Sequence, residues 1–234
     1  TSPKDFVDKV SKQFINLTEL LKLTNNDFIR TSEDRHKEYV KTVWKKLEKL
    51  GDIYLDTYKG WYSITDESFI AENEITTDKK NQKIGPSGDI LQWLEEPSYF
   101  FRLSKWQDKL LEFYSKNPDF VKPKSRYNEV IKFVEKGLQD LSISRTSFSW
   151  GINVPGSSNH IIYVWLDALF NYISVLTKNN KFDNYWPADA HIVGKDILRF
   201  HAIFWPAFLL SANLKLPKKV FAHGWWTIDG EKMS

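Results

Sequence analysis

Five residues of this sequence have the types and the spacing of a small binding site. Trp165, Ala168 and Tyr172 lie at i, i+3 and i+7, which places them on one face of a helix. Ile197 and His201 lie at i and i+4, so a second helix can add to the same aromatic and apolar wall. One hydroxyl and one imidazole in such a wall suit an uncharged, polarizable side chain such as a thioether, which methionine has. Packing in an ordinary core is the alternative that spacing alone leaves open.

The last residues of the chain suggest a second ligand, one that carries phosphate. Residues 220–234 read VFAHGWWTIDGEKMS, which is an apolar strand, a His-Gly pair, a glycine turn and a Lys-Met-Ser sequence. Gly224 at the end of the strand lets backbone approach a ligand closely, and Lys232 just beyond the Gly230 turn is well placed to meet phosphate. Because Gly-x-Lys turns are common, a solvated hairpin tip is the alternative.

The elements that would position these residues alternate between strand and helix. The sequence predicts, in order, a buried strand at 160–166, a helix at 167–176, a strand at 190–193, a tight turn at 194–196, a helix at 197–210 and a strand at 220–222. This order implies an α/β fold with a parallel, doubly wound sheet, whose ligands sit beyond the carboxyl ends of its strands. Trp165, Asp196 and His223 fall at such ends.

The residues before 156 have a different organisation. Ser2 and Pro3 open an amphipathic helix over residues 2–23, and a second amphipathic helix at 36–50 stops at Gly51. The sequence then predicts strand pieces at 52–64, a polar and exposed stretch at 68–88, a strand at 93–99 and helices at 103–114 and 126–137.

The composition is that of a globular chain with a sizeable core, because 41% of the 234 residues are apolar and 15% are aromatic. The sequence has no run of about 18 apolar residues and no basic segment followed by an apolar one, so we expect neither a membrane span nor a signal peptide. It has no cysteine and five scattered histidines, which excludes disulfides and thiolate zinc sites and predicts no metal site. A net charge of +3 is too small to argue for nucleic-acid binding from charge alone.

Several strings of this sequence together resemble the methionyl-tRNA synthetases, a family of class I aminoacyl-tRNA synthetases. They are YFFRLSKW at 99–106, ISR at 143–145, YVWLDAL at 163–169, IVGKDILRFHAIFWPAFL at 192–209 and AHGWWTIDGEKMS at 222–234. KMS alone is a weak signal, but the strings occur in this order and spacing nearly from end to end.

The resemblance implies a Rossmann-type, doubly wound parallel sheet that is split by a connective insertion domain. Residues 1–29 would belong to the first half of the catalytic domain, residues 30–155 would be the insertion, and residues 156–234 would be the second half, ending in the KMS loop. Within the insertion, a zinc-free knuckle is expected at about 55–95 and a helical part at about 100–140.

The resemblance also implies roles for single residues. The predicted methionine-binding residues are Trp165, Ala168, Leu169, Tyr172, Ile197 and His201. The predicted ATP-binding residues are Gly194, Lys195, Asp196, His223, Gly224 and Trp226. The Asp196 carboxylate can accept hydrogen bonds from ribose hydroxyls. The residues expected beside adenine are His223, Gly224 and Trp226. Lys232 is the predicted catalytic residue, because the KMS loop would stabilise charge that develops on the triphosphate.

Three departures from the family pattern change these expectations. Leu169 stands where some members have proline, which alters the shape of the pocket slightly. Residues 61–69 (WYSITDESF) occupy the place where many relatives carry cysteine knuckles, so we predict no zinc there. The HIGH signature, expected before Thr1, and the closing Lys-Ser of KMSKS are absent, so we expect this segment alone to be inactive.

The implied activity is that of a methionine-tRNA ligase. ATP, as its Mg²⁺ complex, would activate methionine to methionyl-adenylate, and the methionyl group would pass to the 3′ end of tRNA(Met). Neither step needs a protein nucleophile. The implied setting is a monomer away from membranes in the cytoplasm, with an organelle matrix as the alternative. Two other hypotheses stay open: a class I synthetase for another aliphatic amino acid, and a noncatalytic tRNA-binding or interaction protein on the same scaffold.

Overall fold

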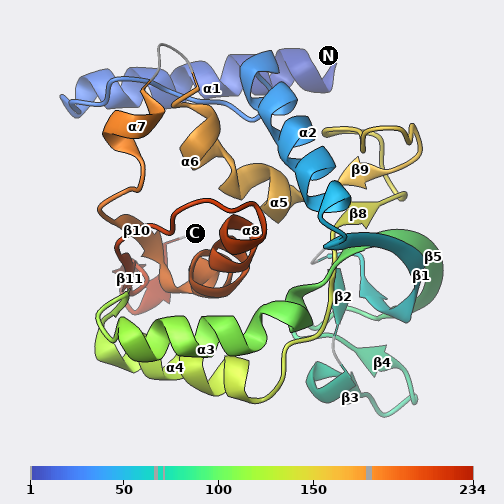
Figure 1. Ribbon diagram of the computed structural model, residues 1–234. Coiled ribbons are helices and arrows are strands. Elements are labelled where there is room, and N and C mark those ends of the chain that lie inside the picture. The colour runs from blue at the N-terminus through green and yellow to red at the C-terminus, as the bar shows by residue number, and fades with distance from the viewer. Residues whose placement is uncertain (1, 66–67, 71, 178–180, 234) are drawn as a thin grey trace.

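The computed structural model describes residues 2–65, 68–70, 72–177 and 181–233 (Figure 1). Two helices open the chain, α1 (Pro3–Leu20) and α2 (Asp34–Lys49). The Ser2 hydroxyl accepts a hydrogen bond from the backbone N–H of Asp5, and Pro3 has the φ angle of a first helical residue, so α1 begins where the sequence predicts. The turn after α2 contains Gly51, whose φ of +74° is costly for any other residue.

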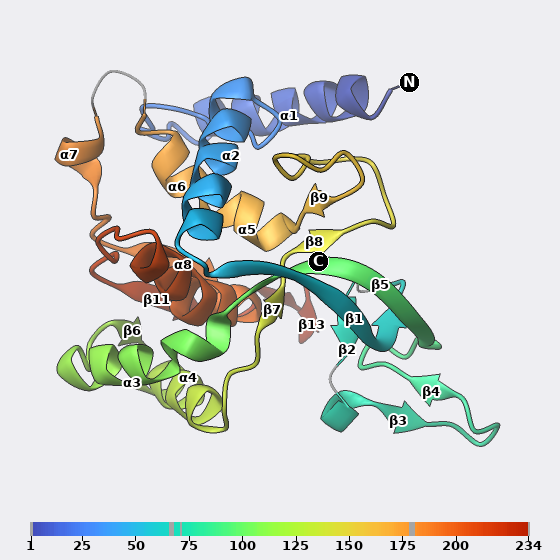
Figure 2. The same ribbon diagram turned by 45° about the vertical axis from the view of Figure 1, so that its right-hand side comes forward.

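An antiparallel sheet follows these helices, with the strand order β2-β1-β5-β7. Its strands are β1 (Ile53–Ser63), β2 (Ser68–Ile70), β5 (Gln92–Phe101) and β7 (Leu141–Ser142). β1 and β5 pair along nearly their whole length and form the long curved ribbon of Figure 2. Between them lie the 3₁₀ turn η1 (Glu72–Glu74) and a small hairpin of β3 (Thr76–Thr77) and β4 (Lys83–Ile84).

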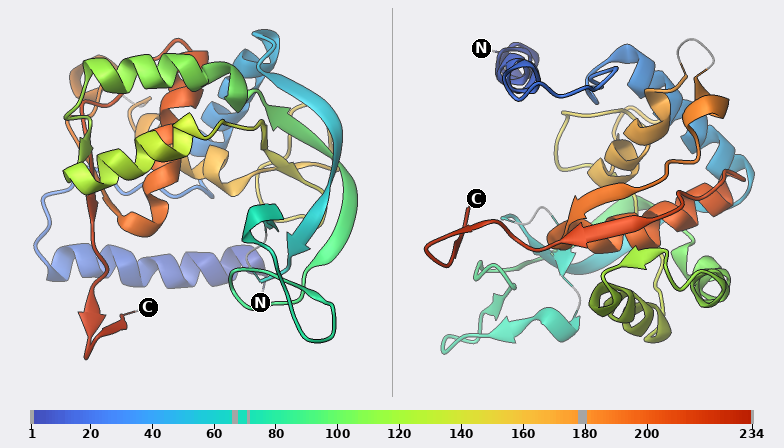
Figure 3. Two further views of the ribbon diagram at one scale, coloured as in Figure 1. Left: turned by 90° about the horizontal axis from the view of Figure 1, so that it is seen from below. Right: turned by 90° about the vertical axis from the view of Figure 1, so that its left-hand side faces the viewer.

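A parallel sheet of three strands, in the order β10-β11-β6, carries the later part of the chain. Its strands are β6 (Val121–Lys122), β10 (His191–Gly194) and β11 (Val220–His223). On one side of β10 and β11 lie η2 (Leu103–Trp106), α3 (Gln107–Lys116) and α4 (Lys124–Glu135), and on the other lie α5 (Val164–Leu169) and α6 (Asn171–Ser174) (Figure 3, right). The predicted α/β fold with a parallel sheet is therefore confirmed.

The segment between β10 and β11 is mostly helical, as predicted, but its geometry changes along the way. It runs through the 3₁₀ turn η4 (Lys195–Ile197), the π-helical turn η5 (Phe200–Phe204) and the α-helix α8 (Trp205–Ser211). The short helix α7 (Phe182–Tyr185) precedes β10, and a hairpin of β12 (Thr227–Ile228) and β13 (Glu231–Lys232) follows β11. A π turn holds one extra residue, so it rotates the residues after it relative to those before it.

The prediction of a strand at 160–166 in the parallel sheet is wrong in the length of the strand and in its pairing. Only Ile161–Ile162 forms a strand, β9, and it pairs antiparallel with β8 (Ser144–Arg145) instead of joining the parallel sheet. Because α5 begins at Val164, Trp165 lies in the first turn of a helix and not at the end of a strand. A continuous apolar run is compatible with a buried strand or a buried helix, and tertiary packing favours the helix here.

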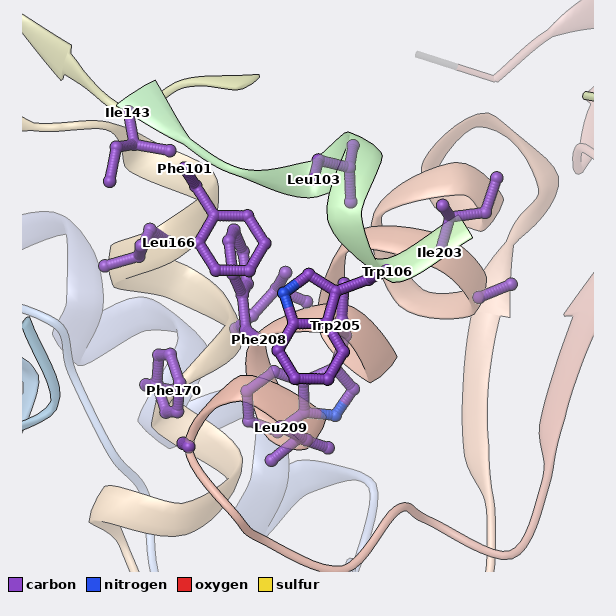
Figure 4. Packing of buried hydrophobic residues seen from close by; sticks show 14 of the residues in the cluster. Phe101, Leu103, Trp106, Ile143, Leu166, Phe170, Ile203, Trp205, Phe208 and Leu209 are labelled. Carbon is purple, nitrogen blue, oxygen red and sulfur yellow. The ribbon is translucent and has the colours of Figure 1, made fainter. Parts of the chain in front are cut away.

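One hydrophobic core joins residues from both sheets and most of the helices. α8 lies at its centre, where Phe208 meets Phe101 of β5 at 4.8 Å between ring centroids and Trp205 meets Phe170 at 4.9 Å (Figure 4). The core therefore fixes the helical segment that follows β10. It also crosses the expected boundary at residue 155, since β6 pairs with β11, whereas none of its residues precedes the boundary at residue 29; the division into insertion and catalytic halves stays a prediction.

α1 contrasts with this core, because none of its residues is buried. Its apolar side chains lie on the outside of the molecule, with Phe6 60% and Leu20 77% exposed. The amphipathic pattern predicted the helix correctly but not what covers its apolar face. Among the described residues, no helix is both long and apolar enough to cross a membrane.

Candidate active site

The structure brings four of the predicted methionine-binding residues together, and each comes from a short helical element beside the parallel sheet. Trp165 lies on α5, Tyr172 on α6, Ile197 at the end of η4 and His201 in η5. The Trp165 and Tyr172 rings lie 6.1 and 5.7 Å from the His201 ring, centroid to centroid. The predicted cluster therefore forms, but the prediction of a single helix for Trp165 and Tyr172 is wrong, because the chain forms two short helices, α5 and α6, there.

Hydrogen bonds fix the protonation of the His201 ring. Its Nδ1 lies 2.9 Å from the carbonyl oxygen of Ile197, and a carbonyl can only accept, so Nδ1 carries the proton. In the neutral ring Nε2 is then an acceptor, and the Tyr172 hydroxyl, 2.8 Å away, donates to it. Both polar groups of the cluster are thus satisfied without charge.

Burial keeps this cluster neutral. His201 is 2% exposed, and burial lowers the pKa of its imidazole below the ordinary value, an effect that the hydrogen bond to Ile197 only partly offsets. Burial likewise raises the pKa of the Tyr172 hydroxyl, so the hydroxyl stays protonated. The cluster consequently presents aromatic faces and uncharged polar atoms, a surface suited to an apolar, polarizable group.

Three residues that the sequence did not single out complete this cluster. The Phe200 ring stacks on Trp165 at 3.8 Å with 7° between their planes. His191, at the start of β10, lies 4.2 Å from the Tyr172 ring, and its Nε2 accepts a hydrogen bond of 3.2 Å from the indole of Trp205. Phe200 lies three residues after Ile197, so helical spacing could have identified it, whereas only tertiary structure reveals His191.

A buried histidine ties α5 and α6 to helix α2. His36 is fully buried, and its Nε2 lies 2.6 Å from an Asp167 carboxylate oxygen while its Nδ1 lies 2.8 Å from the Ser174 hydroxyl. Asp167 belongs to α5 and Ser174 to α6, the two helices that carry Trp165 and Tyr172. The His36 imidazole therefore fixes the position of α5 relative to α6.

The other two predicted methionine-binding residues lie beside the cluster. Ala168 is half-buried on α5, one turn after Trp165, and its carbonyl accepts a hydrogen bond from the Asn171 side chain. Leu169 is 1% exposed and belongs to the hydrophobic core. Their roles in binding stay predictions.

The predicted nucleotide-binding residues lie at the carboxyl ends of β10 and β11. Gly194 and His223 are register partners there, so the turn of Lys195 and Asp196 starts beside the His-Gly pair. The Asp196 carboxylate folds back over Gly194, where an added Cβ atom would lie 2.6 Å from Oδ1. This edge exposes backbone and a carboxylate at the place where ligands of parallel α/β sheets bind.

The segment between β11 and the hairpin of β12 and β13 contacts this edge. The Lys195 ammonium lies 3.6 Å from the centre of the Trp225 ring, a residue that the sequence analysis did not assign. Trp226 is 69% exposed, and its carbonyl accepts from the backbone N–H of Met233. Lys232 lies on β13, opposite Thr227, and its side chain is outside the described residues.

Comparison with known proteins identifies the family. The family model described as "tRNA synthetases class I (M)" matches residues 1–234. The chain belongs to this family of class I tRNA synthetases. The predicted resemblance is thereby confirmed, and so is the Rossmann-like catalytic architecture of the class.

Relatives within the family are similar to this chain over nearly its whole length. A methionine-tRNA ligase of Rickettsia felis is 56% identical over 99% of the chain, and one of Rhizobium meliloti is 50% identical over 100% of it. The crystal structure of Mycobacterium tuberculosis methionyl-tRNA synthetase bound by methionyl-adenylate superposes on 93% of the chain with a TM-score of 0.87 at 48% identity. The chain spans 45%, 46% and 44% of these three proteins, respectively.

Two further features of this synthetase chain bear on its ligands. Within the residues that the structure describes, no three His, Asp or Glu side chains gather as a metal site would require. A surface depression of about 520 Å³ lies between Phe113 of α3 and residues 214–218, away from every predicted site residue. None of the predicted site residues lines it, so the aromatic cluster and the sheet edge remain the better candidate for the active site.

Proposed function

We propose that the full-length protein acts as a methionine-tRNA ligase. ATP, bound as its Mg²⁺ complex, reacts with the methionine carboxylate at the α-phosphate, which gives methionyl-adenylate and releases pyrophosphate. A ribose hydroxyl at the 3′ end of tRNA(Met) then attacks the acyl carbon and releases AMP. The neutral Tyr172 and His201 pair beside Trp165 is the observation that carries this proposal, and the identity of the relatives supports it.

The aromatic cluster selects the amino acid. With Nδ1 of His201 bound to Ile197 and its Nε2 bound to Tyr172, the cluster has no charged group to offer. A charged side chain would lose its hydration there without gaining a partner, whereas a thioether gains contacts with aromatic rings. Trp165, Ala168, Leu169, Tyr172, Ile197 and His201 are the methionine-binding residues of this proposal.

The sheet edge binds the nucleotide. The Asp196 carboxylate accepts from ribose hydroxyls, and the exposed backbone at Gly194 and Gly224 lets the ligand approach closely. Lys195, His223 and Trp226 complete the adenosine side, and Lys232 stabilises negative charge on the triphosphate. Because η4 joins Asp196 to Ile197 directly, this edge and the aromatic cluster meet at the point where the carboxylate and the α-phosphate must react.

The setting of the enzyme is also part of the proposal. We place it in the cytoplasm as a monomer that meets tRNA(Met) as its macromolecular substrate. The sheet of β1 and β5 has no cysteine to offer zinc, so elemental analysis of the purified protein should find less than about 0.1 zinc per chain.

Calorimetry with the full-length protein tests the proposal most directly. Methionine should bind and leucine should not, and both His201→Ala and Trp165→Ala should weaken methionine binding by about thirtyfold or more, since each removes part of the wall of the site. Trp93→Ala is the matched control, because Trp93 is half-exposed on β5 far along the chain from the cluster. Binding of leucine at methionine strength would favour a synthetase for another aliphatic amino acid. A protein that binds tRNA but neither methionine nor ATP would favour the noncatalytic alternative.

A further inference from the structure

A proline interrupts the hydrogen bonds of the helix that carries His201. In an α-helix the carbonyl of Ala202 would accept from the backbone N–H of residue 206, four residues later, and in a π-helical turn the same N–H would reach the carbonyl of His201, five residues earlier. Residue 206 is proline, which has no N–H to donate. Ala202 is fully buried, so water cannot supply the missing donor, and an unsatisfied carbonyl in this place would be costly.

A tyrosine from another helix supplies that donor. The Tyr114 hydroxyl of α3 donates a hydrogen bond of 2.5 Å to the Ala202 carbonyl. Tyr114 is itself fully buried, and burial raises the pKa of its hydroxyl, which therefore remains a donor. Phe113 and Phe120 pack against its ring and leave it little freedom to turn away.

The bond lies inside the π-helical turn. η5 spans Phe200–Phe204, and the backbone N–H of Trp205 bonds to the carbonyl of Phe200, five residues back. Ala202 is in the middle of this turn and directly follows His201. A π turn displaces the residues after it by one position, so the register of η5 sets the direction of the His201 ring relative to Tyr172.

Helix α4 braces the same turn from a second direction. The Arg199 guanidinium, at the entry to η5, lies 4.4 Å from the ring centre of Phe133 on α4. The Tyr127 hydroxyl of α4 donates to the carbonyl of Tyr114 at 3.1 Å, which ties α4 to α3. The α3 and α4 pair thus contacts the turn that carries His201 through Tyr114 and through Phe133.

We propose that Tyr114 is a positioning residue of the methionine site: its hydroxyl makes the hydrogen bond that Pro206 cannot supply and so holds η5 in the register that points His201 at Tyr172. The inference rests on the proposed function, because it assigns Tyr114 an effect on methionine and not on ATP. Tyr114 touches no substrate, and its effect passes through the backbone of Ala202.

The test compares variants of the full-length enzyme in methionine-dependent exchange of pyrophosphate with ATP. Tyr114→Phe removes only the hydroxyl and should raise the KM for methionine about five- to tenfold, with the KM for ATP changed less than about twofold. Tyr54→Phe is the matched control, since it removes a hydroxyl that also donates a hydrogen bond, to the Asp140 carboxylate, but lies on β1 of the antiparallel sheet; it should leave both KM values within about twofold of wild type.

A second variant separates positioning from a loss of general stability. The double variant Tyr114→Phe with Pro206→Ala places an N–H four residues after Ala202, so the carbonyl regains a donor, but only in the α-helical register and not in the π register of η5. It should therefore fold and keep a raised KM for methionine, because the register that points His201 at Tyr172 is lost. If Tyr114→Phe alone does not fold, the double variant decides the question, and a folded double variant with a wild-type KM for methionine overturns the inference.

His201→Ala in the same assay distinguishes the two proposals. If His201→Ala impairs methionine use while Tyr114→Phe does not, the proposed function stands and the inference about Tyr114 fails. Equal increases of the KM for methionine and for ATP in Tyr114→Phe would also overturn it, because they would indicate only a destabilised fold. If His201→Ala itself leaves methionine use unchanged, the assigned methionine site fails and the inference fails with it.

Discussion

The aromatic cluster and the sheet edge differ in how much of their geometry exists before any ligand binds. His201 is 2% exposed, and both of its ring nitrogens are hydrogen-bonded within the protein. Trp226 at the sheet edge is 69% exposed, and the loop from Gly224 onward lies on the surface. The proposed amino-acid side is thus pre-organised, while the proposed nucleotide side offers backbone and charged groups that a ligand must still arrange.

This difference follows from the local sequences. α8 and the end of η5 are apolar on almost every side, so the core encloses them and fixes the cluster that they carry. The hairpin of β12 and β13 has only two residues in each strand and pairs only with itself among the described strands. A short isolated hairpin is marginally stable, so its position depends on what it contacts.

The largest expected effect is that of acid on the aromatic cluster, which should lower the free energy of unfolding by about 2 kcal/mol. Burial, reinforced by the neighbouring His201, lowers the pKa of His191 from 6.5 to about 4. Above pH 6.5 the His191 imidazole is neutral in both the folded and the unfolded protein, so the full stability is present. Between pH 6.5 and 4 His191 binds a proton in the unfolded protein but not in the folded protein, so stability falls. The free energy of unfolding, measured with urea, should therefore fall by about 2 kcal/mol from pH 7.5 to pH 5 through His191 alone.

A single substitution checks the origin of that loss. His191→Gln keeps an acceptor for the Trp205 indole but cannot titrate, so its stability should decline less steeply over the same range. His201, whose pKa burial also lowers, contributes to the remaining slope in the same direction. Equal slopes for wild type and His191→Gln would show that His191 is not responsible for the acid sensitivity.

Gly194→Ala should impair the nucleotide side alone, by about tenfold in the KM for ATP. The new Cβ atom would lie 2.6 Å from the Asp196 carboxylate and 3.9 Å from the His223 ring, so the carboxylate must move. Methionine affinity should change less than about twofold, because His201 hydrogen-bonds to Ile197 and Tyr172 in the described part of the structure and not to that carboxylate.

A double-mutant cycle tests whether the carboxylate transmits this effect. In an Asp196→Ala background, Gly194→Ala should cost little more, since the group it displaces is already gone. Additive losses would mean that the alanine obstructs the nucleotide itself. A comparable loss of methionine affinity would contradict the separation of the two sides.

The sequence predicted the parts of this site that depend on local periodicity. Helical spacing was enough to single out Tyr172 and His201 as residues of two helices that could face one cavity, and apolar runs that end in glycine were enough to locate β10 and β11. The apolar run at 160–166 failed as a strand because its period is ambiguous and its neighbour in space, β8, could not be known from local sequence.

The missing partners were not predictable, because they come from distant parts of the chain. His36 lies 131 residues from Asp167, and Tyr114 lies 88 residues from Ala202. One local signal did exist: a proline inside the predicted helix at 197–210 implies a carbonyl without its helical donor. That signal predicts that a donor must exist but not which residue supplies it.

The contact between Lys195 and Trp225 should have the smallest effect, and it tests how loosely the hairpin is held. A cation over an exposed ring contributes about 0.5–1 kcal/mol, so Trp225→Leu should raise the KM for ATP about two- to fivefold and leave methionine affinity unchanged. Trp225→Phe keeps a ring face for the ammonium and should fall between wild type and Trp225→Leu. If both variants match wild type, the hairpin takes its working position from contacts with the nucleotide alone, and the contrast with the pre-organised cluster is sharper than the structure indicates.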